Sequence, residues 1–478
     1  MTPSTGTNTY RKDLLSGIGY TALSKYTSVV LRIGISAILA RMLSPDDFGI
    51  AGIALVFINF CAVISVSGIS PAIVQNQDLT DGDIENIFSF SFYLGLGSAA
   101  FVIVCSPLVG LFYRNATLPR FTAMLSAAVF FSILTMVPNA MALRDKNFKF
   151  IATRTIIVEV FAAIISLVGI YAGAGIYTLA IMPIASAICM FILTFRQYRI
   201  RLPLTFHFES MRKILSFSLN QIGFNICNYC YRNVDKLLLG KFLGMSELGY
   251  YDKANHVVML PINNVALVVS PVLHPLWAKF QTDKDQIKEK YLQITKILAF
   301  IGFPIAGISF FSAREIILCL FGPNWEASVP IFRIFSLNIG ILIVQSAVGS
   351  AFQALNHTRE LLIGAIFSTL AVSAFLAIGL ALASNLAIVI CITCSFFVIF
   401  VFYHSLLFYR CLKLGWAEFL YNLRHPILFT LAISGAAFAL NYLVRIENLF
   451  LFATVKFAVL ALLCLPALFY FVKKIKLD

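Results

Sequence analysis

Long apolar stretches follow one another along almost the whole chain, separated by short polar segments. Each stretch contains roughly 20 mostly apolar residues, the length that an α-helix needs to cross a bilayer. The runs are continuous and do not alternate in short segments, which excludes a transmembrane β-barrel. Of the 478 residues, 60% are apolar and 12% are charged, against roughly 45–50% and about 25% in soluble domains. The sequence therefore predicts an all-α polytopic membrane protein.

The apolar stretches predict about fourteen transmembrane helices. The first six are predicted between residues 17 and 195, and the next six between 213 and 408. Within the second set, the seventh, eighth and ninth are predicted at 213–240, 248–277 and 292–320. Two further spans at 426–444 and 449–472 follow. Beyond these spans, no segment is long enough to form a soluble catalytic domain.

The distribution of Lys and Arg predicts the orientation of the chain in the membrane. With the N-terminus inside, 22 basic residues lie in cytoplasmic segments and 7 on the opposite side. Because cytoplasmic loops collect Lys and Arg, both termini are expected in the cytoplasm. Most of the net charge of +14 thus reflects topology, and a nucleic-acid partner is not expected.

An internal repeat appears at an offset of 200 residues. It aligns Arg32 with Arg232, Leu39 with Leu239, Gly49 with Gly249, and Ser70-Pro71 with Ser270-Pro271. The repeat predicts a six-helix lobe at 1–205, a second six-helix lobe at 206–412, and two additional helices at 413–478. An even number of spans makes the lobes parallel repeats, with a site between them near the midplane.

Ionisable residues inside the spans are the candidate functional residues, because each is costly in a bilayer unless it faces protein or water. Basic candidates are Lys25, Arg32, Arg232 and Lys236, and acidic candidates are Asp235 and Glu159. Asn220, Gln221, Asn225 and Asn228 add polar lining. Lys and Arg pair with phosphate oxygens, so such a net-cationic cavity favours a phosphorylated or acidic substrate.

Structural interpretations of these residues remain open. Arg232 and Asp235 can neutralise each other within one helix. Lys25, Lys253 and Lys296 can extend to a water interface, and Lys456 can reach the periplasmic surface or a partner helix. Asp81-Gly82-Asp83 has the composition of a metal pair but stands isolated in a short loop. No nucleophile motif, phosphate-binding loop or zinc pattern is present, so neither an enzyme, a bound metal nor a cofactor is expected.

Two segments resemble the signatures of bacterial polysaccharide exporters. The first runs from Leu39 to Ile50, and the second comprises residues 233–240 and 248–254. They are similar to the O-antigen, colanic-acid and teichuronic-type flippases of the multidrug/oligosaccharidyl-lipid/polysaccharide exporter superfamily. The resemblance implies a V-shaped pair of six-helix lobes in the bacterial inner membrane. It also implies transfer of an undecaprenyl-pyrophosphate-linked oligosaccharide to the periplasmic leaflet for lipopolysaccharide or exopolysaccharide biosynthesis. A polysaccharide polymerase and other assembly proteins are the implied partners, beside membrane lipids.

The sequence hypothesis is a flippase that works by alternating access. The pyrophosphate is expected against Lys25 and Arg32 of the first half and Arg232 and Lys236 of the second. The related lipid II flippases space their cavity arginines differently, so this assignment rests on the cavity residues themselves. Asp235 or Glu159 is expected to couple transport to an H⁺ or Na⁺ gradient. The alternatives are a multidrug/cation antiporter, whose cavity should hold more acids than bases, and a non-transporting scaffold of a polysaccharide assembly complex.

Overall fold

Helices make up most of the described part of the chain, which comprises residues 5–66, 69–76, 78–203, 229, 232–278, 283–444, 446 and 448–474. These residues contain no strand, and the prediction of an all-α protein is confirmed. The computed structural model forms two compact units, Met1–Gly249 and Tyr250–Asp478. The predicted divisions at 205/206 and 412/413 rest on the repeat and stay a prediction.

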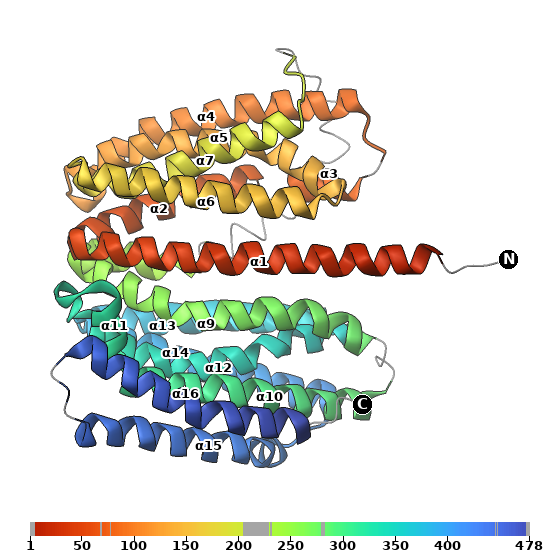
Figure 1. Cartoon of the computed structure of the whole chain (residues 1–478), viewed down its shortest axis with the longest axis vertical. Coiled ribbons are helices and arrows are strands. Elements are labelled where there is room, and N and C mark those ends of the chain that lie inside the picture. The colour runs from red at the N-terminus through yellow and green to blue at the C-terminus, as the bar shows by residue number, and fades with distance from the viewer. Residues whose placement is uncertain are drawn as a thin grey trace. The chain divides into compact units, whose positions relative to one another are not determined.

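The first unit contains a bundle in which α5 packs against α4 and α7, and α6 against α1 and α7 (Figure 1). Its helices are α1 (Thr5–Met42), α2 (Pro45–Val66), α3 (Ile69–Gln75), α4 (Asp81–Tyr113), α5 (Thr117–Arg144), α6 (Phe148–Tyr171) and α7 (Thr178–Gln197). Residues 232–242 are also helical. The 3₁₀ turn η1 (Gly175–Tyr177) leads into α7.

The second unit is built around α10 and α12, which pack against each other and respectively against α15 and α14 (Figure 1). Its helices are the larger part of α9 (Met245–Ala278), α10 (Lys284–Phe311), α11 (Ala313–Phe321), α12 (Ser328–Ala354), α13 (Thr358–Ala381), α14 (Asn385–Leu407), α15 (Trp416–Leu443) and α16 (Leu449–Lys474). The short turns η2 (Pro323–Trp325) and η3 (Phe408–Leu412) precede α12 and α15.

Ten helices of the described residues are long and apolar enough to cross a membrane. The chain is therefore a multi-pass membrane protein, as the apolar stretches predicted. A shorter apolar helix, Leu449–Cys464, lies near the end of the chain. The predicted seventh span at 213–240 falls mostly outside the described residues.

Two helices of the first unit, α2 and α4, begin with the same kind of side-chain cap. Ser44 donates from its backbone N–H and its Oγ to Asp47 Oδ2, at 2.9 and 2.7 Å, before α2. Thr80 makes the same pair of bonds to Asp83 Oδ2, at 3.1 and 2.9 Å, before α4. Such reciprocal caps satisfy N–H groups that have no partner inside the helix. The carboxylate of Asp83 thus has a structural role at this helix start.

The internal repeat is visible where α2 and α9 begin. A Cβ on Gly49 would lie 1.9 Å from the carbonyl oxygen of Met245, and a Cβ on Gly249 would lie 2.0 Å from that of Pro45. Pro45 and Met245 are the first residues of their helices. The two contacts are therefore reciprocal, and each needs a residue without a side chain.

A third contact obeys the same offset. Ser246 Oγ donates to Asp46 Oδ1 at 3.2 Å, across 200 positions of sequence. Each of the three contacts thus joins one helix start to the equivalent position of the other. The offset of these contacts equals that of the repeat read from the sequence, and the six-helix repeat itself stays a prediction.

The predicted ninth span, 292–320, is two helices. α10 ends at Phe311 and α11 begins at Ala313. Ser312 separates them with a φ of −117° and a ψ of 21°, outside the α-helical region. The apolar character continues across Ser312, which is why hydropathy alone reads one long span.

The last two helices are fastened to the second unit by polar contacts. Asn422 Nδ2 donates to Leu292 O at 2.8 Å, and Asn441 Nδ2 donates to Phe311 O at 3.1 Å. Both bonds join residues 130 positions apart, so α15 runs parallel to α10 along its length. α16 in turn packs against α11 and α15.

Candidate functional site

An ion pair inside the first unit joins two residues that the sequence singled out separately. Arg32 lies on α1, and Glu159 lies on α6, against which α1 packs. Arg32 Nε donates to Glu159 Oε1 at 2.9 Å, and Arg32 Nη2 donates to the same oxygen. The two helices thus bring together a base and an acid that are 127 positions apart.

The two partners differ sharply in exposure. The side chain of Glu159 is 6% exposed and that of Arg32 is 65% exposed. A buried carboxylate is costly in apolar surroundings unless a charge or hydrogen bond compensates it, and Arg32 supplies both. The exposed guanidinium meanwhile has five N–H donors, more than this contact uses. The contact with Glu159 therefore leaves N–H donors of Arg32 unused.

Lys25 lies nearly two turns before Arg32 on α1 and is half-buried. Residues seven apart on a helix share nearly the same face, as the sequence predicted. Within the described ranges, Lys25 forms no ion pair with an acidic residue. It therefore adds positive charge to the α1 surface that carries Arg32.

The second group of predicted residues lies in the helical segment 232–242. Arg232 is exposed, whereas Asp235 and Lys236 are half-buried. Tyr113 Oη at the end of α4 donates to Leu237 O at 3.1 Å, which fixes this segment against the first bundle. Arg232 forms no ion pair with an acid of the described part of the chain. Asn220, Gln221, Asn225 and Asn228 lie outside the described residues.

Arg154 is a buried polar link in the first unit that the sequence did not single out as a site residue. It lies in the second turn of α6 and is 4% exposed. Arg154 Nη1 donates to Thr194 Oγ1 at 2.8 Å, and Nη2 donates to Asn139 Oδ1 at 3.0 Å. α6 begins at Phe148, so Arg154 lies within the helix. Arg154 joins α5, α6 and α7.

Lys456 on α16 is 1% exposed, less than the other charged residues of the second unit whose burial is described. Its Nζ donates to Glu315 Oε1 at 2.9 Å, Asn441 Oδ1 at 2.6 Å and Phe311 O at 2.9 Å. Three acceptors match the three donors of an ammonium group. Of the open interpretations of Lys456, the partner helix is confirmed. The sequence offered no pairing signal, because Glu315 lies 141 positions away.

Comparison with solved structures defines the class of fold. The lipid II flippase MurJ in an inward closed conformation matches with a TM-score of 0.75 and 15% identity, over 95% of this chain and 99% of that chain. An inward-facing multidrug resistance MATE family transporter of the MOP superfamily matches with a TM-score of 0.62 and 15% identity, over 84% and 95%. The fold is that of this class of multi-pass helical transporters.

Comparison of sequences then gives the family. Residues 38–330 match the family described as polysaccharide biosynthesis protein, and the chain belongs to that family. Teichuronic acid biosynthesis protein TuaB of Bacillus subtilis (strain 168) is 25% identical over 340 residues, covering 70% of this chain and 69% of TuaB. Lipopolysaccharide biosynthesis protein WzxC of Escherichia coli (strain K12) is 24% identical over 354 residues, covering 72% and 70%. Succinoglycan biosynthesis transport protein ExoT of Rhizobium meliloti (strain 1021) is 24% identical over 351 residues, covering 72% and 68%. The resemblance seen at Leu39–Ile50 is thereby confirmed.

Proposed function

We propose that the chain transfers an undecaprenyl-pyrophosphate-linked oligosaccharide from the cytoplasmic to the periplasmic leaflet of a bacterial inner membrane. The family and the relatives named for teichuronic acid, lipopolysaccharide and succinoglycan support a role in cell-surface polysaccharide biosynthesis. The fold shared with a lipid II flippase supports a lipid-linked substrate. The proposal makes the chain a transporter and not an enzyme.

The proposed architecture has about fourteen spans in two parallel six-helix lobes, followed by two helices, with both termini in the cytoplasm. The reciprocal contacts of Gly49 and Gly249 support the parallel repeat. In this arrangement, alternating access opens one cavity first to the cytoplasmic and then to the periplasmic side. The polyprenyl tail stays in lipid while the sugars pass through the cavity.

The observation that carries this proposal is the ion pair between the exposed Arg32 and the buried Glu159. An exposed guanidinium within a membrane-spanning helix offers charge-assisted hydrogen bonds to a diphosphate. Lys25 strengthens the positive charge of this face. Arg232 and Lys236 supply the corresponding charges from the second repeat, and the asparagine-rich segment before them contacts the sugars.

Glu159 also offers a means of ion coupling. Protonation of its carboxylate, or Na⁺ binding to it, would remove the charge that holds Arg32. Arg32 would then turn fully to the diphosphate. Asp235 is the second candidate for this role, and the gradient would be H⁺ or Na⁺.

A multidrug/cation antiporter is the main alternative, since a MATE transporter shares the fold. A cationic substrate would need an acid that is open to it. Glu159 is already paired with Arg32, so a cationic substrate would have to displace Arg32 from this carboxylate. The pair thus favours an anionic substrate over a cationic one.

The proposal is tested in a strain that lacks the chain. Lipid-linked oligosaccharide should accumulate on the cytoplasmic leaflet and surface polysaccharide should disappear. Wild-type protein should restore export, whereas Arg32→Ala and Arg232→Ala at equal protein levels should not. If the chain were a non-transporting scaffold, the intermediate in the deletion strain would be distributed across both leaflets. Export that persists in both variants would contradict the cationic site.

A further inference from the structure

The short helix α11 and the turn η2 follow α10 and precede α12, yet they contact two helices that are distant in the sequence. On one side, α11 packs against α16. On the other side, Phe321 of α11 and Trp325 of η2 lie against the first turns of α9. Residues 313–325, which comprise α11 and η2, therefore form a bridge between α16 and α9 within the second unit.

Lys456 binds α16 to the bridge on both sides of the helix break at Ser312. Its Nζ donates to Phe311 O, before the break, at 2.9 Å, and lies 2.9 Å from Glu315 Oε1, after the break. The side chains of Lys456 and Glu315 are both buried, so solvent and salt screen this ion pair little. The direction in which α11 leaves α10 therefore depends on α16.

The other end of the bridge makes an aromatic contact with α9. The rings of Phe321 and Trp325 have centroids 5.8 Å apart, and both residues are buried. The Trp325 ring meets the Tyr250 ring edge-on at 6.0 Å, and Lys253 Nζ lies 5.3 Å from the centre of the Phe321 ring. Ser328 Oγ, at the start of α12, donates to Tyr250 O at 3.1 Å. Close-packed side chains transmit a displacement to their neighbours, so the bridge sets the position of Tyr250.

Tyr250 lies one helical turn after the residues of α9 that contact the start of α2. Ser246 Oγ donates to Asp46 Oδ1, and Met245 lies close to Gly49. α9 is one helix from Met245 to Ala278, so residues 246 and 250 move together. Packed side chains and rigid helices are the elements that couple distant parts of a protein. The position of α16 is thereby linked to the contact between α9 and α2.

We propose that α16 holds the start of α9 in place through this bridge and so keeps the contact between α9 and α2 closed. Release of Lys456 from Glu315 would free the bridge, and that contact would then open more often. The proposal goes beyond the proposed transport function and does not depend on the identity of the substrate. It gives α16, one of the two additional helices, a conformational role.

The test is backbone hydrogen exchange of the full chain in lipid nanodiscs, measured by mass spectrometry. Exchange of a protected amide reports how often its segment opens. Lys456→Met should raise exchange about fivefold or more in residues 313–325 and also in residues 245–253, a small part of the effect of breaking a buried ion pair. Faster exchange in residues 313–325 with unchanged exchange in residues 245–253 would show that Lys456 only attaches α16, and would overturn the proposal. Unchanged exchange in both segments would overturn it too.

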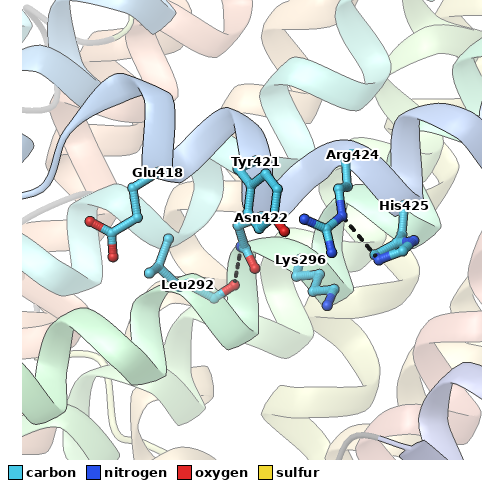
Figure 2. Close-up of a pocket in the computed structure, with 7 residues that line it drawn as sticks. All are labelled: Leu292, Lys296, Glu418, Tyr421, Asn422, Arg424 and His425. Atoms are coloured by element: carbon cyan, nitrogen blue, oxygen red, sulfur yellow. Dashed lines mark hydrogen bonds between the residues drawn. The ribbon is translucent and has the colours of Figure 1, made fainter.

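Two asparagines of α15 provide a milder variant and its matched control. Asn441 Nδ2 donates to Phe311 O at 3.1 Å, and Asn441 Oδ1 accepts from Lys456 Nζ. Asn422 Nδ2 donates to Leu292 O at 2.8 Å, near the opposite end of α10 (Figure 2). Each alanine variant thus loses a bond to a carbonyl of α10, but only Asn441→Ala also loosens Lys456.

Asn441→Ala should raise exchange in residues 245–253 about twofold, because Lys456 loses one of its three acceptors. Asn422→Ala should leave exchange in residues 245–253 as in the wild type. Equal exchange in the two variants would overturn the proposal. Asn441 is exposed, so this comparison decides the matter even when Lys456→Met fails to fold.

Discussion

Arg32 donates two hydrogen bonds to the buried carboxylate of Glu159 while its own side chain stays 65% exposed. The pair joins α1 to α6 and combines structural and chemical roles. Glu159 depends on Arg32 for compensation of its charge. Arg32, in contrast, keeps most of its side chain exposed beside this contact.

This asymmetry predicts unequal effects of removing each partner. Arg32→Ala leaves a buried carboxylate without its donor and should lower stability by about 1–3 kcal/mol. Glu159→Gln leaves an exposed guanidinium and should cost less than about 1 kcal/mol. Thermal unfolding in one detergent measures both, and Arg120→Ala, an exposed arginine of α5, is the control. Equal losses of stability in Arg32→Ala and Glu159→Gln would contradict the claim that Glu159 depends on the ion pair more than Arg32 does.

Glu159 should also determine the response to an ion gradient. Glu159→Gln mimics the neutral acid, so export by this variant should no longer change when an ionophore collapses the H⁺ or Na⁺ gradient. Wild-type export should fall several-fold under the same treatment. Asp235→Asn, measured alongside, distinguishes the two acids. A Glu159→Gln variant that responds as wild type does would exclude Glu159 as the coupling residue.

The contacts of Lys456 with Glu315, Asn441 and the carbonyl oxygen of Phe311 should stabilise the packing of α16 against the second unit. Lys456→Met removes the charge that compensates Glu315 and the bonds to Phe311 O and Asn441. Breaking a buried pair in this way costs about 3–5 kcal/mol. The Lys456→Met/Glu315→Gln double variant should recover part of this loss in a melting experiment. A double variant no more stable than the single one would argue against a charge-compensating role.

The sequence predicted the helical class and most of the apolar helices, because these depend on local hydropathy. It also identified Arg32 and Glu159 as costly charges within spans. Their pairing could not be predicted, since it depends on how α1 packs against α6. The same limit applies to Lys456 with Glu315 and to Arg154 with Thr194. Ser312 escaped prediction because the break it makes in the helix leaves hydropathy unchanged.

The close contacts of Gly49 and Gly249 give a further prediction. Gly49→Ala would bring its Cβ to 1.9 Å from the carbonyl oxygen of Met245, and Gly249→Ala would bring its Cβ to 2.0 Å from that of Pro45. Both distances are far shorter than a van der Waals contact. Both should strongly reduce the amount of folded protein recovered by size-exclusion chromatography. Gly97→Ala on α4 is the matched control, because no atom lies within 4 Å of its added Cβ, and the higher helix propensity of alanine should leave it unharmed. Normal yields of both junction variants would contradict the close contact.

The most direct test of the account is the leaflet position of the substrate. Purified wild-type protein is reconstituted into vesicles with undecaprenyl-pyrophosphate-linked oligosaccharide, and an impermeant glycosidase removes sugar from the outer leaflet. Wild-type protein should then bring the oligosaccharide lipid of the inner leaflet to the outer leaflet, where the glycosidase can cleave it. With Arg32→Ala it should do so at least about tenfold more slowly, the rate effect of losing one hydrogen bond between charged groups. Accessibility that matches protein-free vesicles, or that is the same for wild type and Arg32→Ala, would contradict transport through the cationic site.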